Sequence, residues 1–218
     1  MENKDYQELA NQLRCPSGNH GVFFAERMYR SNNNMIFKTI DHLPMYANTT
    51  ILEIGFASGR HVPYLLKKSE LLHYIGLEIS DLMIEKANDI NSLLVENKKA
   101  SFQKAQNQGT LAFANESIDH CFSVNTLYFW HDPARYLYEI HRVLKLGGTL
   151  TLSFIEKSFG EKLPFTKYNF QFYPTDLILR LMRNIGFANI EKWEYTEQTK
   201  NNLNQQVIRP FIILKGVK

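Results

Sequence analysis

From residue 50 onward, short apolar runs alternate with stretches in which apolar residues recur at helical spacing. Strands that alternate with helices in this way predict a parallel sheet with helices on both faces. The strands are expected near residues 50–54, 73–78, 100–104, 119–125 and 148–155. The intervening helices are expected near residues 60–68, 80–96 and 132–145.

Both ends of the chain add elements to this pattern. Residues 5–14 predict a short helix, and residues 21–43 predict one or two amphipathic helices with a break near the polar run at 31–34. After the fifth strand, the pattern predicts one helix and two strands, near residues 175–185, 189–195 and 207–214. Two consecutive terminal strands can pair as a hairpin, so a mixed sheet with an antiparallel member is expected.

The helix at 132–145 has recognisable signals at both ends. Asp132 and Pro133 provide an acidic cap and a proline at the first helical position. Gly147 and Gly148 are expected to stop the helix.

A glycine-rich turn, Gly55-Phe56-Ala57-Ser58-Gly59, follows the first expected strand. In an open α/β sheet, ligands bind beyond the carboxyl ends of the strands, and small residues let them approach the backbone. A P-loop would need a lysine after the last glycine, but Arg60 and His61 stand there. A dinucleotide-binding turn would need a third small residue where this chain has Arg60.

An acidic residue, Glu53, stands two positions before the first glycine. A carboxylate at this point would repel a pyrophosphate and attract a cation. The turn therefore favours a ligand with positive charge and no phosphate. S-adenosylmethionine fits, because it carries an ammonium, a sulfonium and a nucleoside.

Three motifs, in order, resemble the class I S-adenosylmethionine-dependent methyltransferases, in particular the methyltransferase type 11 group. ILEIGFASG at 51–59 is similar to the first motif of the family, with Ala57 in place of the middle glycine. YIGLEIS at 74–80 is similar to the second motif, whose acid holds the ribose hydroxyls, and Glu78 lies 19 residues after Gly59. The stretch 117–153 is similar to the fourth strand, helix and fifth strand of the family, including the turn R-V-L-K-x-G-G.

The resemblance implies a doubly wound, Rossmann-like α/β fold. Its seven-stranded mixed sheet would have the order 3-2-1-4-5-7-6, with the last strand antiparallel. The methyltransferase domain would span residues 46–218. An N-terminal helical extension, residues 1–45, would close over the cofactor, where Arg27, Tyr29 and Asn32 could reach it. The implied activity is methyl transfer from S-adenosylmethionine to a small-molecule acceptor, with S-adenosylhomocysteine as product.

The resemblance also indicates which residues would bind the cofactor. They are Glu53, Gly55, Phe56, Ala57, Gly59, Glu78, Ile79, Asn107, Gln108 and Asn125. Ile79 would pack on the adenine face. Asn107 departs from the family, which often has an aspartate that meets the adenine amino group. An amide carbonyl can still accept from an amine, but without charge assistance, so a weaker bond is expected.

No catalytic residue is assigned from the sequence, and the candidates are His61, Tyr128 and His131. A histidine can take a proton near neutral pH, but each of these two could equally serve the turn in which it lies. Methyl transfer from a sulfonium often needs no base, since alignment of the reactants can supply on the order of 7–11 kcal/mol.

Aromatic residues are the candidates for acceptor binding: Tyr128, Trp130, Tyr168 and Phe170. The last two belong to an aromatic-rich insertion at about residues 156–174. Alternation in an extended chain would send its rings to one side, where the segment could act as a lid. The alternative is that these rings only cover the core. After Asn125 the chain lacks the prolines typical of methyltransferases that modify base or glutamine amines.

The amino-acid composition disfavours several classes of binding partner. The net charge of +3 is spread over 218 residues without a long basic run, which disfavours a polynucleotide partner. Two cysteines suggest neither a disulfide framework nor a zinc site, and no metal is expected. The polar N-terminus and the lack of a ~20-residue apolar span make a cytoplasmic protein, with no membrane partner, the default.

Two alternatives from other classes remain at this point. A non-catalytic S-adenosylmethionine-binding sensor or scaffold would keep Glu53 and Glu78 but have a blocked or featureless acceptor pocket. A nicotinamide-dependent oxidoreductase is disfavoured by Arg60 and Glu53.

Overall fold

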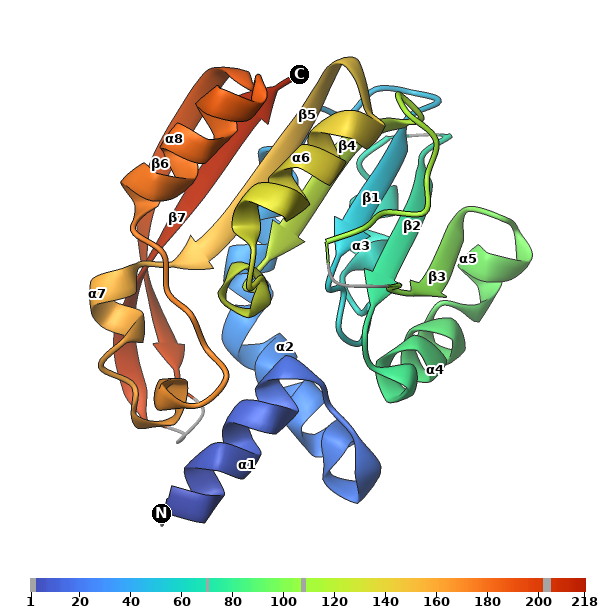
Figure 1. Cartoon of the computed structure of the whole chain (residues 1–218). Helices are drawn as coiled ribbons and strands as arrows, with labels where there is room; N and C mark the ends of the chain where they lie inside the picture. The colour runs from blue at the N-terminus through green and yellow to red at the C-terminus, as the bar shows by residue number, and fades with distance from the viewer. Residues whose placement is uncertain (1–2, 70, 107–108, 202–204) are drawn as a thin grey trace.

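A seven-stranded sheet forms the centre of the computed structural model, which describes residues 3–69, 71–106, 109–201 and 205–218 (Figure 1). The strands are β1 (Thr50–Ile54), β2 (His73–Glu78), β3 (Ala100–Lys104), β4 (Ile118–Val124), β5 (Leu144–Ile155), β6 (Ala188–Lys200) and β7 (Gln206–Val217). Their order is β3-β2-β1-β4-β5-β7-β6. Strands β1 to β5 pair in parallel, whereas β7 runs antiparallel to both β5 and β6. The predicted strand order and antiparallel last strand are confirmed.

The helices lie on both faces of this sheet, as the alternating pattern predicted. They are α1 (Asn3–Arg14), α2 (Gly18–Asp41), α3 (Val62–Leu66), α4 (Asp81–Ile90), α5 (Ser92–Glu96), α6 (Pro133–Val143), α7 (Lys157–Gly160) and α8 (Thr175–Ile185). Two short 3₁₀ helices follow β4 and α7, η1 (Leu127–Phe129) and η2 (Pro164–Lys167). In Figure 1, α6 and α8 cover the near face, and the end of α2 runs behind the sheet.

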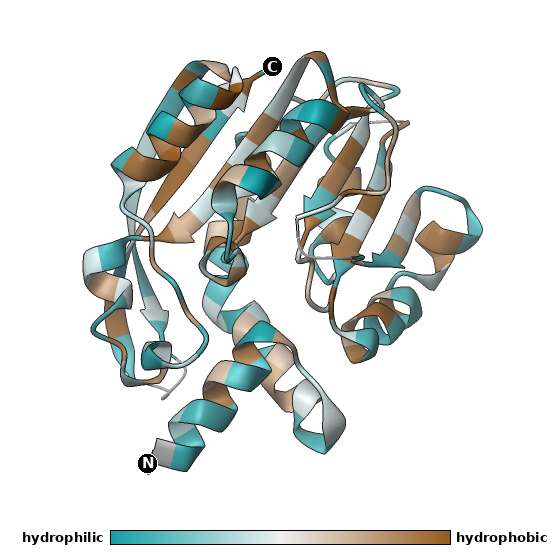
Figure 2. Cartoon of the chain, viewed as in Figure 1, coloured by the Kyte–Doolittle hydropathy of each residue, from teal (hydrophilic) through white to brown (hydrophobic). Residues whose placement is uncertain are grey.

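Both faces of the central strands are apolar, so the sheet separates two cores. On the α6 side, Leu150 and Leu152 of β5 belong to one buried cluster with Leu137 of α6. On the other side, Phe122 of β4 belongs to a second cluster with Met35 of α2. Figure 2 shows the resulting brown strands and the more polar outer faces of the helices. This is the expected burial of a parallel sheet that is covered on both faces.

Helix α2 is continuous where the sequence predicted a possible break, within residues 31–34. The polar side chains of this run bond to the β6–β7 hairpin. The guanidinium of Arg209 donates to the carbonyl oxygen of Ser31 at 2.7 Å and to Oδ1 of Asn32 at 2.9 Å. The amide of Asn34 donates to Glu197 at 2.6 Å. These tertiary bonds offset the low helix propensity of Ser and Asn.

Two other predicted helix limits are corrected. The helix expected at 80–96 is divided at Asn91, whose amide donates to the carbonyl oxygens of Ala87 and Gly59. Helix α6 ends at Val143, before the glycine pair that was expected to stop it. The chain enters β5 directly at Leu144, because this residue already pairs with Ile118 of β4.

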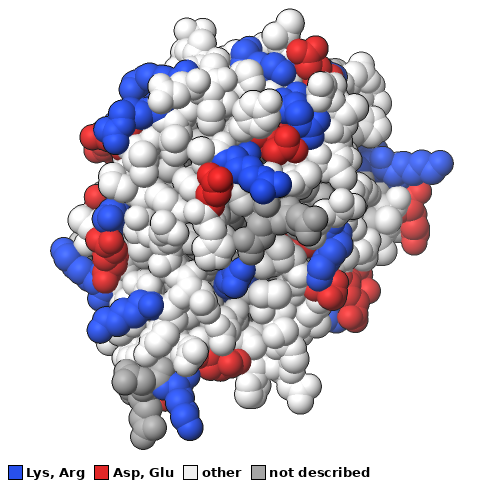
Figure 3. Space-filling view, in the orientation of Figure 1, with Lys and Arg blue, Asp and Glu red and all other residues white. Residues whose placement is uncertain are grey.

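Charged side chains of both signs are mixed over the face of the molecule shown in Figure 3. Within the described ranges, no helix combines the length and the apolar character that crossing a membrane requires.

Glu197 and Arg209 form a buried ion pair that should stabilise the fold strongly against the loss of one partner. Their side chains are 7% and 5% exposed, and Glu197 Oε1 accepts from Arg209 Nε at 2.9 Å. Because Glu197→Ala leaves a buried charge unpaired, we expect a loss of about 3–5 kcal/mol in the free energy of unfolding. Urea denaturation measures it.

Glu194→Ala is the matched control, since it removes the exposed partner of Lys192 on the same strand. Exposed ion pairs contribute little, so its unfolding midpoint should stay close to that of the wild type. Equal midpoints for the two variants would contradict a structural role for the buried pair.

Candidate active site

The glycine-rich turn connects β1 to α3 at the carboxyl edge of the sheet. Gly55 has φ +81°, and a Cβ there would lie 2.2 Å from the Cγ2 of Thr126, in the loop after β4. Gly59 has φ +66°, and a Cβ there would lie 3.0 Å from the Cβ of Ala87 in α4. Glycine is needed at both positions because the backbone is left-handed and its neighbours are close. Gly59 therefore packs on α4, and it is not among the residues that line the cavity described below.

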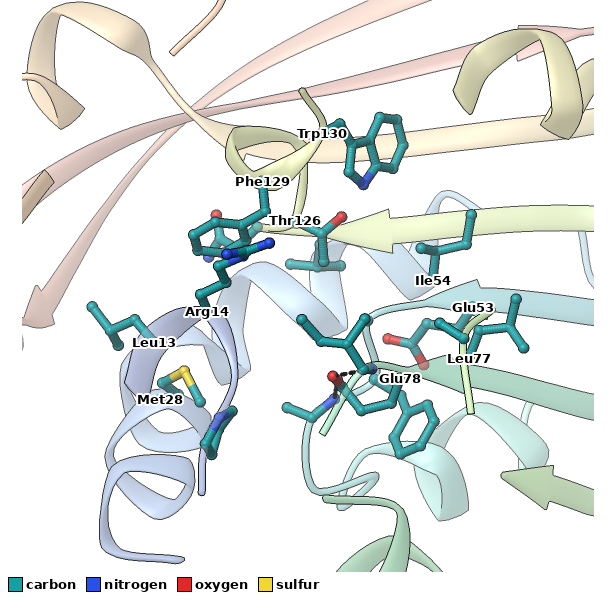
Figure 4. A pocket seen from close by; sticks show the side chains of 18 of the residues that line it. Leu13, Arg14, Met28, Glu53, Ile54, Leu77, Glu78, Thr126, Phe129 and Trp130 are labelled. Atoms are coloured by element: carbon teal, nitrogen blue, oxygen red, sulfur yellow. Dashed lines mark hydrogen bonds between the residues drawn. The ribbon is translucent and has the colours of Figure 1, made fainter. Parts of the chain in front are cut away.

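The carboxylate of Glu78, at the end of β2, accepts three backbone hydrogen bonds. Its Oε2 accepts from Ala57 N at 3.0 Å, and its Oε1 accepts from Ile79 N at 2.6 Å and Ser80 N at 3.1 Å. Burial raises the pKa of Glu78, and the three N–H groups oppose that shift. The carboxylate thus joins the glycine-rich turn to the start of α4. Figure 4 shows it at the cavity wall.

The carboxylate of Glu53 lies deeper, with the side chain 2% exposed. Its Oε2 accepts from the hydroxyl of Tyr74 at 2.5 Å and bonds to Nε2 of His61 at 2.7 Å. Burial, followed by the nearby Glu53, raises the pKa of Tyr74 well above its usual value, so the hydroxyl stays protonated and donates. His61, a candidate base, is therefore held as a partner of Glu53, and Tyr74 is a part of the site that the sequence reasoning missed.

A first cavity opens above these groups, with about 1220 Å³ of empty space, part of it open to solvent. Predicted cofactor residues in its wall are Glu53, Gly55, Phe56, Ala57, Glu78, Ile79 and Asn125. The N-terminal helices close the opposite side, as Figure 4 shows for Leu13, Arg14 and Met28. Tyr29 and Asn32 also line the cavity, as expected. Arg27 does not, and its guanidinium lies over the ring of Phe23.

The sequence reasoning missed Leu13, Arg14 and Met28. Periodicity predicted the helices that contain them. It did not indicate which face of each helix would point to the sheet edge, because that depends on how the helices dock.

A second cavity, with about 670 Å³ of empty space, adjoins the first. Its wall includes Ile155 and four phenylalanines, Phe129, Phe159, Phe165 and Phe170. The β6–β7 hairpin contributes Arg209. Five residues line both cavities: Leu13, Met28, Asn32, Asn125 and Phe129. The two spaces therefore meet at a shared wall beyond the ends of β1 and β4.

Three of the aromatic candidates for acceptor binding line these cavities. Trp130 lines the first cavity and stacks on Tyr136 with ring centroids 4.6 Å apart. Phe170 lines the second and contacts the ring of Phe129 at 4.8 Å. Tyr128 also borders the second, but its hydroxyl donates to Asn125 and accepts from the backbone N–H of Ile155. Both functions of that hydroxyl are used within the protein.

The remaining candidates are not brought to the cavities. His131 is exposed, Tyr168 is half-buried, and neither lines either cavity. Asn107 and Gln108 lie outside the described residues. Cys121 is buried in the core and Cys15 is half-buried, and both are free thiols.

Comparison with known proteins shows a family match over part of the chain. Residues 52–152 match the family model described as a methyltransferase domain. Over 126 residues the chain is 26% identical to YdaC of Bacillus subtilis (strain 168), named as an uncharacterized methyltransferase, with 58% of this chain and 67% of YdaC covered. It is 25% identical to the tRNA U34 carboxymethyltransferase of Edwardsiella ictaluri (strain 93-146), with 70% and 49% covered. The match thus spans about half to two thirds of these relatives.

Among solved structures, the fold is similar to phosphoethanolamine N-methyltransferase 2 of Haemonchus contortus. That structure contains phosphomonomethylethanolamine and S-adenosylhomocysteine. The TM-score is 0.73 at 16% identity, with 98% of this chain and 60% of the other covered. Residues 52–152 therefore match a methyltransferase domain, as the resemblance predicted, and the chain shares the fold of this solved structure. The expectation against a nucleic acid partner is not confirmed, because several relatives are named for tRNA.

Under the sequence prediction that Glu78 holds the ribose hydroxyls, its raised pKa determines how cofactor binding depends on pH. Only the carboxylate can accept freely from ribose hydroxyls, so affinity for S-adenosylhomocysteine should fall as pH decreases toward the pKa of Glu78. Because burial raises this pKa, the fall should begin above the range of an ordinary carboxyl, about 4.3. Calorimetric titration at a series of pH values measures it.

Glu78→Gln removes the titrating group and should abolish this pH dependence. This loss of affinity at low pH is not caused by unfolding through Glu78. Because the pKa of Glu78 is higher in the folded than in the unfolded state, its protonation stabilises the folded protein as pH falls. The prediction is wrong if wild type and variant lose affinity in parallel.

Proposed function

We propose that the first cavity binds S-adenosylmethionine and that the protein transfers its methyl group to a small molecule in the second cavity. The observation that supports this most directly is the carboxylate of Glu78 in the wall of the first cavity. A carboxylate offers about four acceptor positions, and the backbone uses three of them. One acceptor position of the carboxylate therefore remains for the ribose hydroxyls.

The surroundings fit this cofactor better than a phosphate-bearing one. Glu53 and Glu78 add negative charge to the cavity, which disfavours a pyrophosphate. Ile79 is 39% exposed at the cavity wall and offers an apolar surface for the adenine. Gly55 and Ala57 leave room for close approach of a ligand to the backbone.

The bound cofactor supplies an electrophilic methyl group, and the protein supplies orientation. No base is assigned to His61, His131 or Tyr128. His61 bonds to Glu53, His131 lies away from both cavities, and the hydroxyl of Tyr128 is fully used. Alignment of the acceptor with the methyl group is then the main contribution of the site.

The second cavity favours catalysis over the alternative of a non-catalytic sensor or scaffold. A sensor was expected to have a blocked or featureless acceptor site. Here an aromatic cavity adjoins the cofactor cavity and shares five residues with it. The name of the tRNA carboxymethyltransferase supports an RNA acceptor as the second candidate.

The binding test compares two ligands. S-adenosylhomocysteine should bind in calorimetry and NAD should not, because the two carboxylates repel a pyrophosphate. Glu78→Ala should weaken S-adenosylhomocysteine binding at least about tenfold, since charge-assisted bonds contribute roughly 1.5–3 kcal/mol each. Tight binding of NAD alone would refute the proposal.

The acceptor test follows transfer of a labelled methyl group from S-adenosylmethionine. A library of small hydroxylated and aromatic compounds and a preparation of bulk tRNA are the two substrates. Labelled small molecules with unlabelled tRNA would support the proposal, and the reverse would favour the RNA alternative.

A further inference from the structure

Two asparagines, Asn32 of α2 and Asn125 after β4, stand in the wall that the two cavities share. We infer that their amide N–H groups form a donor pair for one oxygen of the acceptor, and that this acceptor is a neutral aromatic hydroxyl compound. The inference deepens the proposed function and rests on it, because it names the substrate class of the same site.

The amide of Asn32 is oriented by Arg209. A guanidinium only donates, so the Asn32 atom that meets it must be the oxygen. Arg209 Nη1 donates to Asn32 Oδ1 at 2.9 Å. The NH₂ group of Asn32 is left to face elsewhere, and within the described ranges the structure shows no protein partner for it.

The amide of Asn125 is oriented by Tyr128 in the same sense. The hydroxyl of Tyr128 already accepts from the backbone N–H of Ile155, and it donates its proton to Asn125 Oδ1 at 3.0 Å. The oxygen of Asn125 is thus occupied, and the NH₂ group remains. The backbone of Asn125 has φ 58°, a conformation that Asn tolerates better than most residues, which holds the side chain at the junction.

The charges of the second cavity are already paired, so the site does not favour an anionic acceptor. The Nε of Arg209 donates to Glu197, and its two terminal nitrogens donate to Glu197, to Asn32 and to the backbone and hydroxyl oxygens of Ser31. All five N–H groups therefore have partners, and a carboxylate acceptor would find no free guanidinium N–H. The phenylalanine rings of the wall favour a flat apolar body.

Two N–H donors also distinguish oxygen from nitrogen as the methylated atom. As the hydroxyl passes its proton to water, its oxygen gains a third lone pair, so two lone pairs can accept from the two amides while the third attacks. A neutral amine has one lone pair, and a donor would occupy the electrons that must attack. In the reaction, an O–CH₃ bond forms as the S–CH₃ bond breaks, the sulfonium becomes the neutral thioether of S-adenosylhomocysteine, and the hydroxyl proton passes to water.

The test measures binding of three probes to the full chain saturated with S-adenosylhomocysteine: 2-naphthol, 2-naphthylamine and 2-naphthoate. In calorimetry, 2-naphthol should bind at least about tenfold more tightly than either of the others, because only it combines a neutral charge with a good acceptor oxygen. An equal or higher affinity for the amine or the carboxylate, or no binding of 2-naphthol, would overturn the inference.

Asn32→Asp and Asn125→Asp make the test specific to the donors. Each keeps the oxygen that bonds to Arg209 or Tyr128 and replaces only the NH₂ group. Each should weaken 2-naphthol binding about tenfold. The S-adenosylhomocysteine affinity of each variant is measured first, so that 2-naphthol is titrated only into saturated protein. Asn184→Asp, the same change at an exposed position of α8, is the control and should have no effect.

The outcomes separate the two proposals. Failure of S-adenosylhomocysteine to bind the wild type would refute the proposed function. Normal S-adenosylhomocysteine binding, with 2-naphthol affinity unchanged in both Asp variants, would refute the donor pair alone.

Discussion

A buried carboxylate that accepts three backbone hydrogen bonds organises the ligand edge of this sheet. Glu78 holds Ala57 in the turn after β1 with one oxygen, and Ile79 and Ser80 at the start of α4 with the other. Ser80 in turn donates from its hydroxyl to the carbonyl oxygen of Pro16 at 2.5 Å, in the connection between α1 and α2. One charge therefore sets the positions of two strand ends and of the helices that close the first cavity.

A second buried charge organises the other side of the site. Arg209 and Glu197 join the β6–β7 hairpin to the middle of α2, at the polar run that includes Asn32. The same contact fixes the orientation of the Asn32 amide at the junction of the two cavities. Hydrogen bonds offset the free-energy cost of removing this ion pair from water, since all five N–H groups of the guanidinium have partners. The stability of the fold and the orientation of the Asn32 amide thus depend on one cluster.

Much of the sheet and part of the wall of the first cavity follow from local sequence. Alternation of apolar runs and helical periods predicted each strand, because a parallel strand is apolar on both faces. The motif around Gly55 and the acid Glu78 predicted a ligand-binding turn, and both residues line the first cavity, because close approach to the backbone and a strand-end carboxylate are local properties. The break predicted near 31–34 was wrong, since the bonds that hold this segment helical come from residues more than 160 positions away.

The sequence by itself determined the class of fold, the glycine-rich turn and the two acids beside it. Only the tertiary structure decided that Tyr74 and His61 share the carboxylate of Glu53, that α1 closes the first cavity, and that Asn32 and Asn125 line both cavities. The physical reason is the range of the interactions. The formation of a strand or turn depends on neighbours along the chain. A hydrogen bond between buried side chains depends instead on which face of each helix docks on the sheet. The packing of the whole chain determines that face.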